Sequence, residues 1–154
     1  MTELAAMCVD AGFSAVRTYI ASGNVVFICQ LAEQDVKSAL EKRLDRFAER
    51  HVGVLVRTAD EMAAVCSDNP FKREAPNRTV AIFLDRPPPR DVLLTAKGLS
   101  DEKIALGARE IYVSYGDRMA GSKLRIPAAQ AGTARNMNTI AKLASMAREL
   151  QSQR

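Results

Sequence analysis

Polar and basic side chains that could hold an anion gather near the C-terminus of the 154-residue chain. Six of them form two short groups: Ser122, Lys123, Thr133, Arg135, Asn136 and Asn138. We expect the last helix to begin near Asn136, so Arg135 would stand beside free backbone N–H groups that favour negative charge. The competing interpretation is a helix cap made by Thr133 or Asn136 next to a solvated basic face.

The charge distribution points to the same stretch. Between residues 122 and 154 the only anion is Glu149, whereas the cations are Lys123, Arg125, Arg135, Lys142, Arg148 and Arg154. This stretch carries +5, so the remaining residues carry −1 and the chain as a whole +4. A surplus that is local predicts an anionic ligand, either a phosphorylated metabolite or the backbone of a nucleic acid. No aromatic residue follows Tyr115, which gives nucleic acid little support because bases stack on aromatic rings.

A second polar group lies near the N-terminus, in the turn Ala21-Ser22-Gly23 between two β-rich runs. Ser22 and Asn24 could complete a site for a small polar or anionic ligand. Alternatively, Ser22 and Gly23 serve only the chemistry of a hairpin turn. Both interpretations stay open.

The sequence lacks the residues that several classes of reaction need. The chain has one histidine, His51, too few for a multi-histidine metal site, and no Gly-rich phosphate loop of the Rossmann or Walker type. We therefore predict no metal, no cofactor and no catalytic residue. An enzyme that uses Lys123 with Ser122 remains an alternative, as does a protein-interaction module.

The three cysteines and the lengths of the apolar runs bear on where in the cell the protein lies. Cys8, Cys29 and Cys66 are odd in number and lie in apolar stretches, which is typical of reduced thiols in a cytoplasm. No run of apolar residues is long enough to cross a membrane. We expect a cytoplasmic protein that does not engage membranes.

The pattern of apolar residues gives an α+β protein. It predicts helices over residues 3–12, 33–50, 58–68, 90–97 and from 136 onward. Strands are expected at 16–20, 24–29, 53–57, 79–84, 104–106 and 110–115. The boundaries that follow are a subdomain over 1–58, a linker helix and loop over 59–77, and a smaller subdomain over 78–154.

Four motifs carry a family resemblance. They are the run from Arg17 to Phe27, Asn69-Pro70-Phe71, Ser122-Lys123-Leu124 and the run from Thr133 to Thr139. In this order they resemble the bacterial family called domain of unknown function 1697. The resemblance implies a two-part α+β protein whose first half is ferredoxin-like, and it implies no activity.

One strand is missing from that pattern. The resemblance implies an apolar strand before the first helix, and the α-β-β-α-β order of residues 3–57 is also one strand short of a closed β-α-β-β-α-β unit. We expect either that Met1 is an internal methionine of a longer frame, or that the open sheet pairs with a second copy. The preferred function is binding of an anionic ligand through Arg135, Lys123, Thr133 and Asn136.

Overall fold

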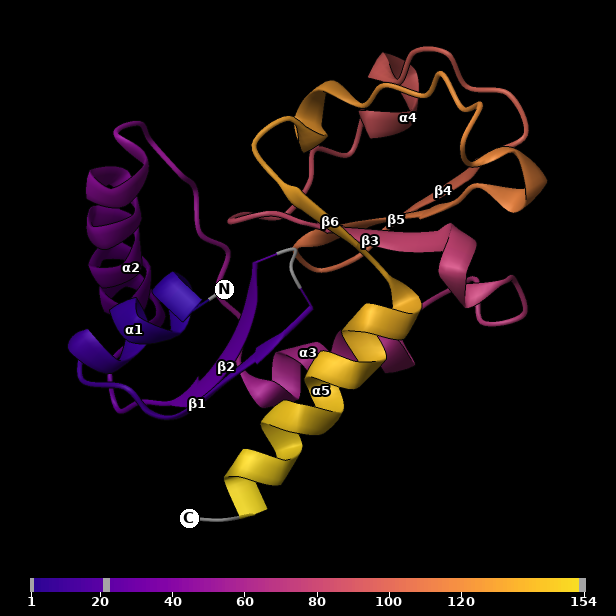
Figure 1. Cartoon of the computed structure of the whole chain (residues 1–154). Coiled ribbons are helices and arrows are strands. Elements are labelled where there is room, and N and C mark those ends of the chain that lie inside the picture. Colours follow the sequence, from indigo (N-terminus) through magenta and orange to yellow (C-terminus); the bar gives the residue numbers. More distant parts are fainter. Residues whose placement is uncertain (1, 21–22, 153–154) are drawn as a thin grey trace. The chain divides into compact units, whose positions relative to one another are not determined.

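The computed structural model describes residues 2–20 and 23–152, and these form two compact units. Unit 1 comprises Met1–Glu61 with Lys142–Arg154, and unit 2 comprises Met62–Ala141 (Figure 1). Each unit has its own antiparallel sheet. The predicted mixed α+β class is confirmed.

Unit 1 contains helix α1 (Thr2–Asp10), the hairpin β1 (Ser14–Tyr19) and β2 (Asn24–Ile28), and helix α2 (Glu33–Ala48). Both predicted helices and the hairpin are confirmed. Gly23 adopts φ +82°, a conformation that favours glycine, at the turn into β2. The core of unit 1 is built on Cys8, Phe13, Val36 and Leu40.

The predicted strand at residues 53–57 is wrong. Residues 51–58 form neither helix nor strand, because the sheet of unit 1 consists of β1 and β2 and no described strand pairs with this segment. Its side chains still pack on the core, through Val54 and Val56. Side chains of α2 take the place of a neighbouring strand for Val54. The Val54 N–H donates to Glu41 Oε2 at 3.0 Å, and its carbonyl accepts from Lys37 Nζ at 2.8 Å.

The two-stranded sheet leaves one edge of β2 without a partner strand among the described residues. Unpaired edges attract other strands. Self-association through this open sheet therefore stays a prediction.

Unit 2 holds most of helix α3 (Ala59–Ser67), which begins with reciprocal hydrogen bonds between Thr58 and Glu61. Thr58 thus caps α3, and the helix predicted over residues 58–68 is confirmed. Asn69 Oδ1 accepts from the Phe71 N–H at 2.9 Å and closes the turn at Pro70. A short 3-10 helix, η1 (Pro76–Arg78), leads into the sheet.

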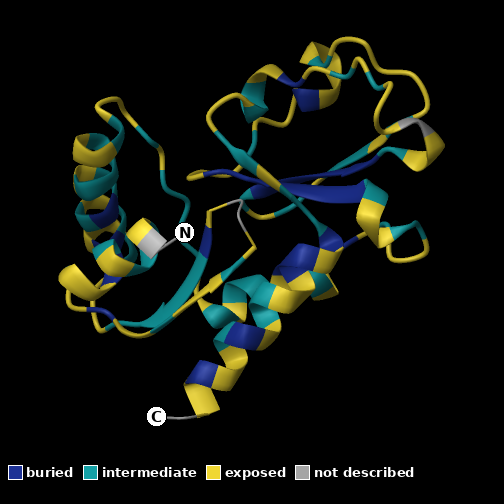
Figure 2. Cartoon of the chain, viewed as in Figure 1, coloured by how far each residue is buried: buried dark blue, intermediate teal, exposed yellow. Residues whose placement is uncertain are grey.

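The sheet of unit 2 has the strand order β4 (Lys103–Leu106), β5 (Glu110–Ser114), β3 (Thr79–Phe83), β6 (Thr133–Asn136). The two central strands, β3 and β5, are buried throughout (Figure 2). Val80 and Ile82 of β3 lie opposite Val113 and Ile111 of β5, and this apolar face carries the core. The predicted strands β3, β4 and β5 are confirmed.

Helical segments cover both faces of this sheet. On the apolar face lie α4 (Val92–Thr95) and the 3-10 helix η3 (Pro127–Ala129), with Val92 and Ile126 in the core (Figure 1). On the other face, the hydroxyl of Tyr112 donates to the Val65 carbonyl of α3 at 2.8 Å. Between β5 and η3 stands the 3-10 helix η2 (Gly116–Arg118), and the last helix is α5 (Met137–Ser152). None of the described helices is long and apolar enough to cross a membrane.

Candidate anion-binding site

Within unit 2, the structure does not bring the two predicted groups of site residues together. Ser122 bonds to Glu102, which directly precedes β4, whereas Thr133, Arg135 and Asn136 belong to β6. Strands β4 and β6 are the two opposite edges of the sheet. Since neighbouring strands lie about 4.8 Å apart, the three spacings between β4 and β6 place these edge strands roughly 14 Å apart. Binding of a ligand by either group stays a prediction.

The residues where β6 leads into α5, 133–139, make contacts that stabilise the fold. Residues 133–136 form an edge strand paired with β3, where the sequence predicts no strand and only a helix that begins near Asn136. Asn136 Oδ1 accepts from the Thr139 N–H at 2.9 Å and so caps α5, as the competing interpretation expected. Arg135 Nη1 donates to the Ala134 carbonyl at 2.8 Å, and burial lowers the pKa of Arg135. Asn138 is exposed in the first turn of α5.

The hairpin residues belong to unit 1. Asn24 is buried and its Nδ2 donates to the Tyr19 carbonyl at 3.1 Å, which ties the two ends of the hairpin loop together. Ser22 lies outside the described residues. This hydrogen bond supports the structural interpretation of the hairpin turn, in which Asn24 stabilises the loop.

Lys123 does lie among cations, although not those expected. Lys97 and Arg125 form an isolated antiparallel bridge, in which the Lys97 N–H donates to the Arg125 carbonyl at 2.8 Å and the Arg125 N–H to the Lys97 carbonyl at 2.7 Å. In such a directly opposed pair both side chains leave the same face, with Cβ atoms about 5 Å apart. Two cations are thus held side by side by the backbone.

The third cation follows from the alternation of the segment. Lys123 and Arg125 are exposed, whereas Leu124 packs on the core of unit 2. Residues two apart in an extended segment point to the same side, so Lys123 joins Arg125 and Lys97. Gly98 permits this approach, because a Cβ at its position would lie 2.2 Å from the Lys123 carbonyl oxygen. We call Lys97, Lys123 and Arg125 the basic bridge.

The three cations of the basic bridge have no ion-pair partner in the described part of the chain. Within residues 2–20 and 23–152, no carboxylate forms an ion pair with any of its three side chains. Like charges directly opposed across a strand pair destabilise it, by a few tenths of a kcal/mol up to about 1 kcal/mol. An anion bound between them would remove that cost.

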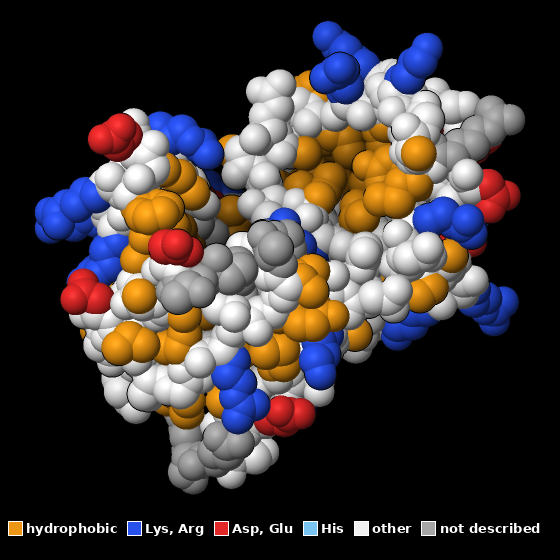
Figure 3. Space-filling model, in the orientation of Figure 1, with side chains coloured by type: hydrophobic (Ala, Val, Ile, Leu, Met, Phe, Trp, Pro, Cys, Tyr) orange, Lys and Arg blue, Asp and Glu red, His pale blue; other side chains and the backbone are white. Residues whose placement is uncertain are grey.

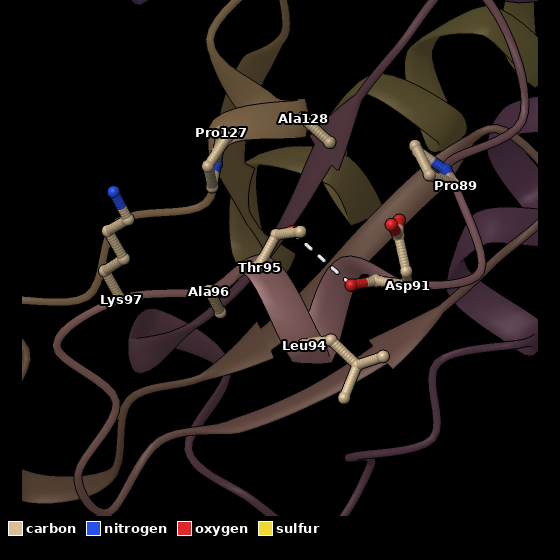
Figure 4. A pocket seen from close by; sticks show the side chains of 8 residues that line it. All are labelled: Pro89, Asp91, Leu94, Thr95, Ala96, Lys97, Pro127 and Ala128. Atoms are coloured by element: carbon tan, nitrogen blue, oxygen red, sulfur yellow. Dashed lines mark hydrogen bonds between the residues drawn. The ribbon is translucent and has the colours of Figure 1, made fainter.

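A surface pocket of about 550 Å³ adjoins the basic bridge and shares Lys97 with it (Figure 4). Its apolar walls come from α4 and η3 and their flanks: Pro89, Leu94, Ala96, Pro127 and Ala128. Asp91 and Thr95 add polar atoms. On the face drawn in Figure 3, hydrophobic side chains gather in a hollow of unit 2, and Lys and Arg side chains stand at the border where α4 lies.

Ser122 supports the loop rather than facing a ligand. Its hydroxyl donates a short hydrogen bond to Glu102, and its Oγ accepts from the Leu124 N–H at 3.2 Å. The Ser100 N–H also donates to Glu102, at 2.7 Å. These two bonds hold the pKa of the Glu102 carboxyl below its ordinary value, the bond from Ser122 contributing most. No hydrogen bond between Lys123 and Ser122 is formed in the described part of the chain.

Replacing Ser122 with alanine is expected to raise the pKa of Glu102 toward its ordinary value. A lowered carboxyl pKa stabilises the fold above the pKa of the unfolded chain, about 4.3, and this contribution is lost as the pH falls through the folded value. The variant should therefore lose stability at neutral pH and show a flatter loss on acidification. Carboxyl NMR titration measures the pKa directly, with Ser67→Ala as the control. An unchanged Glu102 pKa in Ser122→Ala would contradict the assignment.

Residues 1–112 match the family described as protein of unknown function DUF1697, and this is most of the chain. The chain belongs to the DUF1697 family. No activity is established for that family by its description, and no curated protein matches the chain. Of the basic bridge, Lys97 lies inside the DUF1697 match, whereas Lys123 and Arg125 lie beyond it.

The DUF1697 chain also resembles a solved structure, that of a conserved bacterial protein from Streptococcus pneumoniae. The TM-score is 0.78 at 20% sequence identity, and the similarity covers 96% of this chain and 88% of the other. At this identity the likeness shows the fold alone. The family match confirms the predicted family, and it covers two of the four motifs, the run from Arg17 to Phe27 and Asn69-Pro70-Phe71.

Sequence reasoning missed Lys97 and Gly98 as site residues. The helix predicted over residues 90–97 includes Lys97 and ends directly before Gly98. An isolated bridge between residues far apart in sequence has no periodic pattern to reveal it. The one signal available was the local charge surplus, which included Lys123 and Arg125.

Proposed function

We propose that this DUF1697 protein binds a small anionic metabolite, such as a phosphorylated one, at the basic bridge. The observation that carries the proposal is the backbone pairing of Lys97 with Arg125, which holds two cations on one face without a carboxylate partner among the described residues. Lys123 adds a third charge beside them. A group of three cations suits a phosphate or a pair of phosphates better than the long track of a nucleic acid.

The alternative enzyme that pairs Lys123 with Ser122 receives less support, because the Ser122 hydroxyl is engaged by Glu102. We place the binding function in the cytoplasm, a proposal supported by the three cysteines, which are free thiols.

The proposal is tested by calorimetric titration with inorganic pyrophosphate at low and high salt. The double variant Lys97→Gln, Arg125→Gln is expected to bind about tenfold more weakly or worse, and the wild-type affinity should fall as salt rises. The stability of the double variant should rise by a few tenths of a kcal/mol, because the like charges are removed. A purely structural pair would not combine weaker binding with greater stability.

The matched control is Lys142→Gln, Arg148→Gln, which removes the same charge from exposed positions of α5. A general effect of net charge would weaken binding equally in both double variants and would overturn the proposal. Arg135→Gln tests the alternative site at β6, which the sequence predicts. If Arg135→Gln abolishes binding and the Lys97, Arg125 pair does not, the site is at β6 instead.

A further inference from the structure

The pocket beside the basic bridge is an open groove with mostly apolar walls. Its volume, about 550 Å³, lies within the range of small-molecule sites, which are mostly lined by apolar side chains. Leu94 lines it while being 87% exposed, and the neighbouring Leu93 and Leu99 are also exposed. Leu94 therefore adds exposed apolar surface to the wall of the pocket, and a ligand bound there would cover it.

The opposite charges at the two ends of the pocket would orient a charged ligand bound in it. Lys97 follows α4 and Asp91 precedes it, and Figure 4 shows them at opposite ends with Thr95 between them. The basic bridge extends from the Lys97 end. An anionic head is therefore attracted to the Lys97 end and repelled by Asp91 at the other, while an attached apolar chain would lie against Leu94, Pro127 and Ala128.

We propose that the ligand of the basic bridge is an amphiphilic small anion, with one phosphate or carboxylate head on the bridge and a short apolar chain in the α4–η3 pocket. This inference rests on the proposed function, and it adds the class of molecule. The apolar group contributes affinity by leaving water, and the basic bridge fixes the orientation by charge complementarity.

The test is a series of ligands of increasing chain length, from inorganic phosphate to ethyl, butyl and hexyl phosphate, measured by NMR titration below the concentration at which the esters aggregate. Each buried methylene is expected to strengthen binding about two- to fourfold until the pocket is filled, after which affinity levels off. Leu94→Ala should reduce this gain per methylene and leave the affinity for inorganic phosphate unchanged. Leu106→Ala, an exposed leucine on β4, is the matched control.

The outcomes separate the two proposals. Affinity for phosphate that depends on Lys97 and Arg125 but does not change with chain length would overturn the amphiphilic ligand and keep the anion site. Affinity that grows with chain length but equally in Leu94→Ala would place the chain elsewhere, which also overturns this inference. Failure of both phosphate and its esters to bind would overturn the proposed function itself.

Discussion

Replacing Gly98 with alanine is expected to destabilise unit 2 by about 2–4 kcal/mol and to weaken anion binding at the same time. Gly98 has φ +72°, where a residue with a Cβ is strained by roughly 1–3 kcal/mol. The new Cβ would also lie 2.2 Å from the Lys123 carbonyl oxygen, so the backbone of one segment must move. That movement pulls Lys97 away from Arg125. Urea unfolding followed by circular dichroism measures the loss.

Gly116 provides the control for backbone strain. It has φ +64°, yet a Cβ at its position would meet no atom within 4 Å. Gly116→Ala should therefore lose only the stability that the strained φ costs, without the steric part. Its affinity for pyrophosphate should not change. Equal losses of stability in the two variants would show that Gly98 is not needed for the close approach of Lys123.

Replacing Lys37 with methionine is expected to destabilise unit 1 by about 1–3 kcal/mol. Lys37 donates to the Val54 carbonyl and to Glu41 Oε2, and the side chains of both partners in this ion pair are about four-fifths buried, with 17% and 19% exposed. Without Lys37, a carbonyl and a carboxylate of the interior lose a partner, which costs more than the bond itself was worth. Chemical denaturation gives the value.

A double-mutant cycle isolates this coupling. The variant Lys37→Met, Glu41→Leu should lose less stability than the sum of the losses in the two single variants, since the second change removes the carboxylate that the first one left without its ion-pair partner. Lys42→Met serves as the control, because Lys42 is an exposed cation of the same helix and its loss should stay within about 0.5 kcal/mol. If Lys37→Met loses no more than Lys42→Met, the segment around Val54 is held in some other way.

Local patterns were sufficient for most of the fold. The helical spacing of Val36 and Leu40 predicts α2, and both are buried. Gly23 predicts the hairpin, and the run TVAIFL predicts β3. These features depend on residues close in sequence, so periodicity and turn chemistry reveal them.

The incorrect predictions lie where pairing with residues distant in sequence decides whether a segment forms a strand. Residues 53–57 have the composition of a strand, but no described strand lies beside them to accept their hydrogen bonds. Residues 133–136 lack that composition, yet β3 is available and pairs with them. The basic bridge is of the same kind, because the meeting of Lys97 with Arg125 is a property of the tertiary fold and not of either local sequence.

The most direct test of anion binding at the basic bridge is the map of amide shifts when inorganic pyrophosphate is added to the ¹⁵N-labelled protein. We predict that the largest shifts fall in residues 96–99 and 122–126, and that they disappear in Lys97→Gln, Arg125→Gln. Shifts centred on residues 133–139, or shifts that persist in the double variant, would contradict the site.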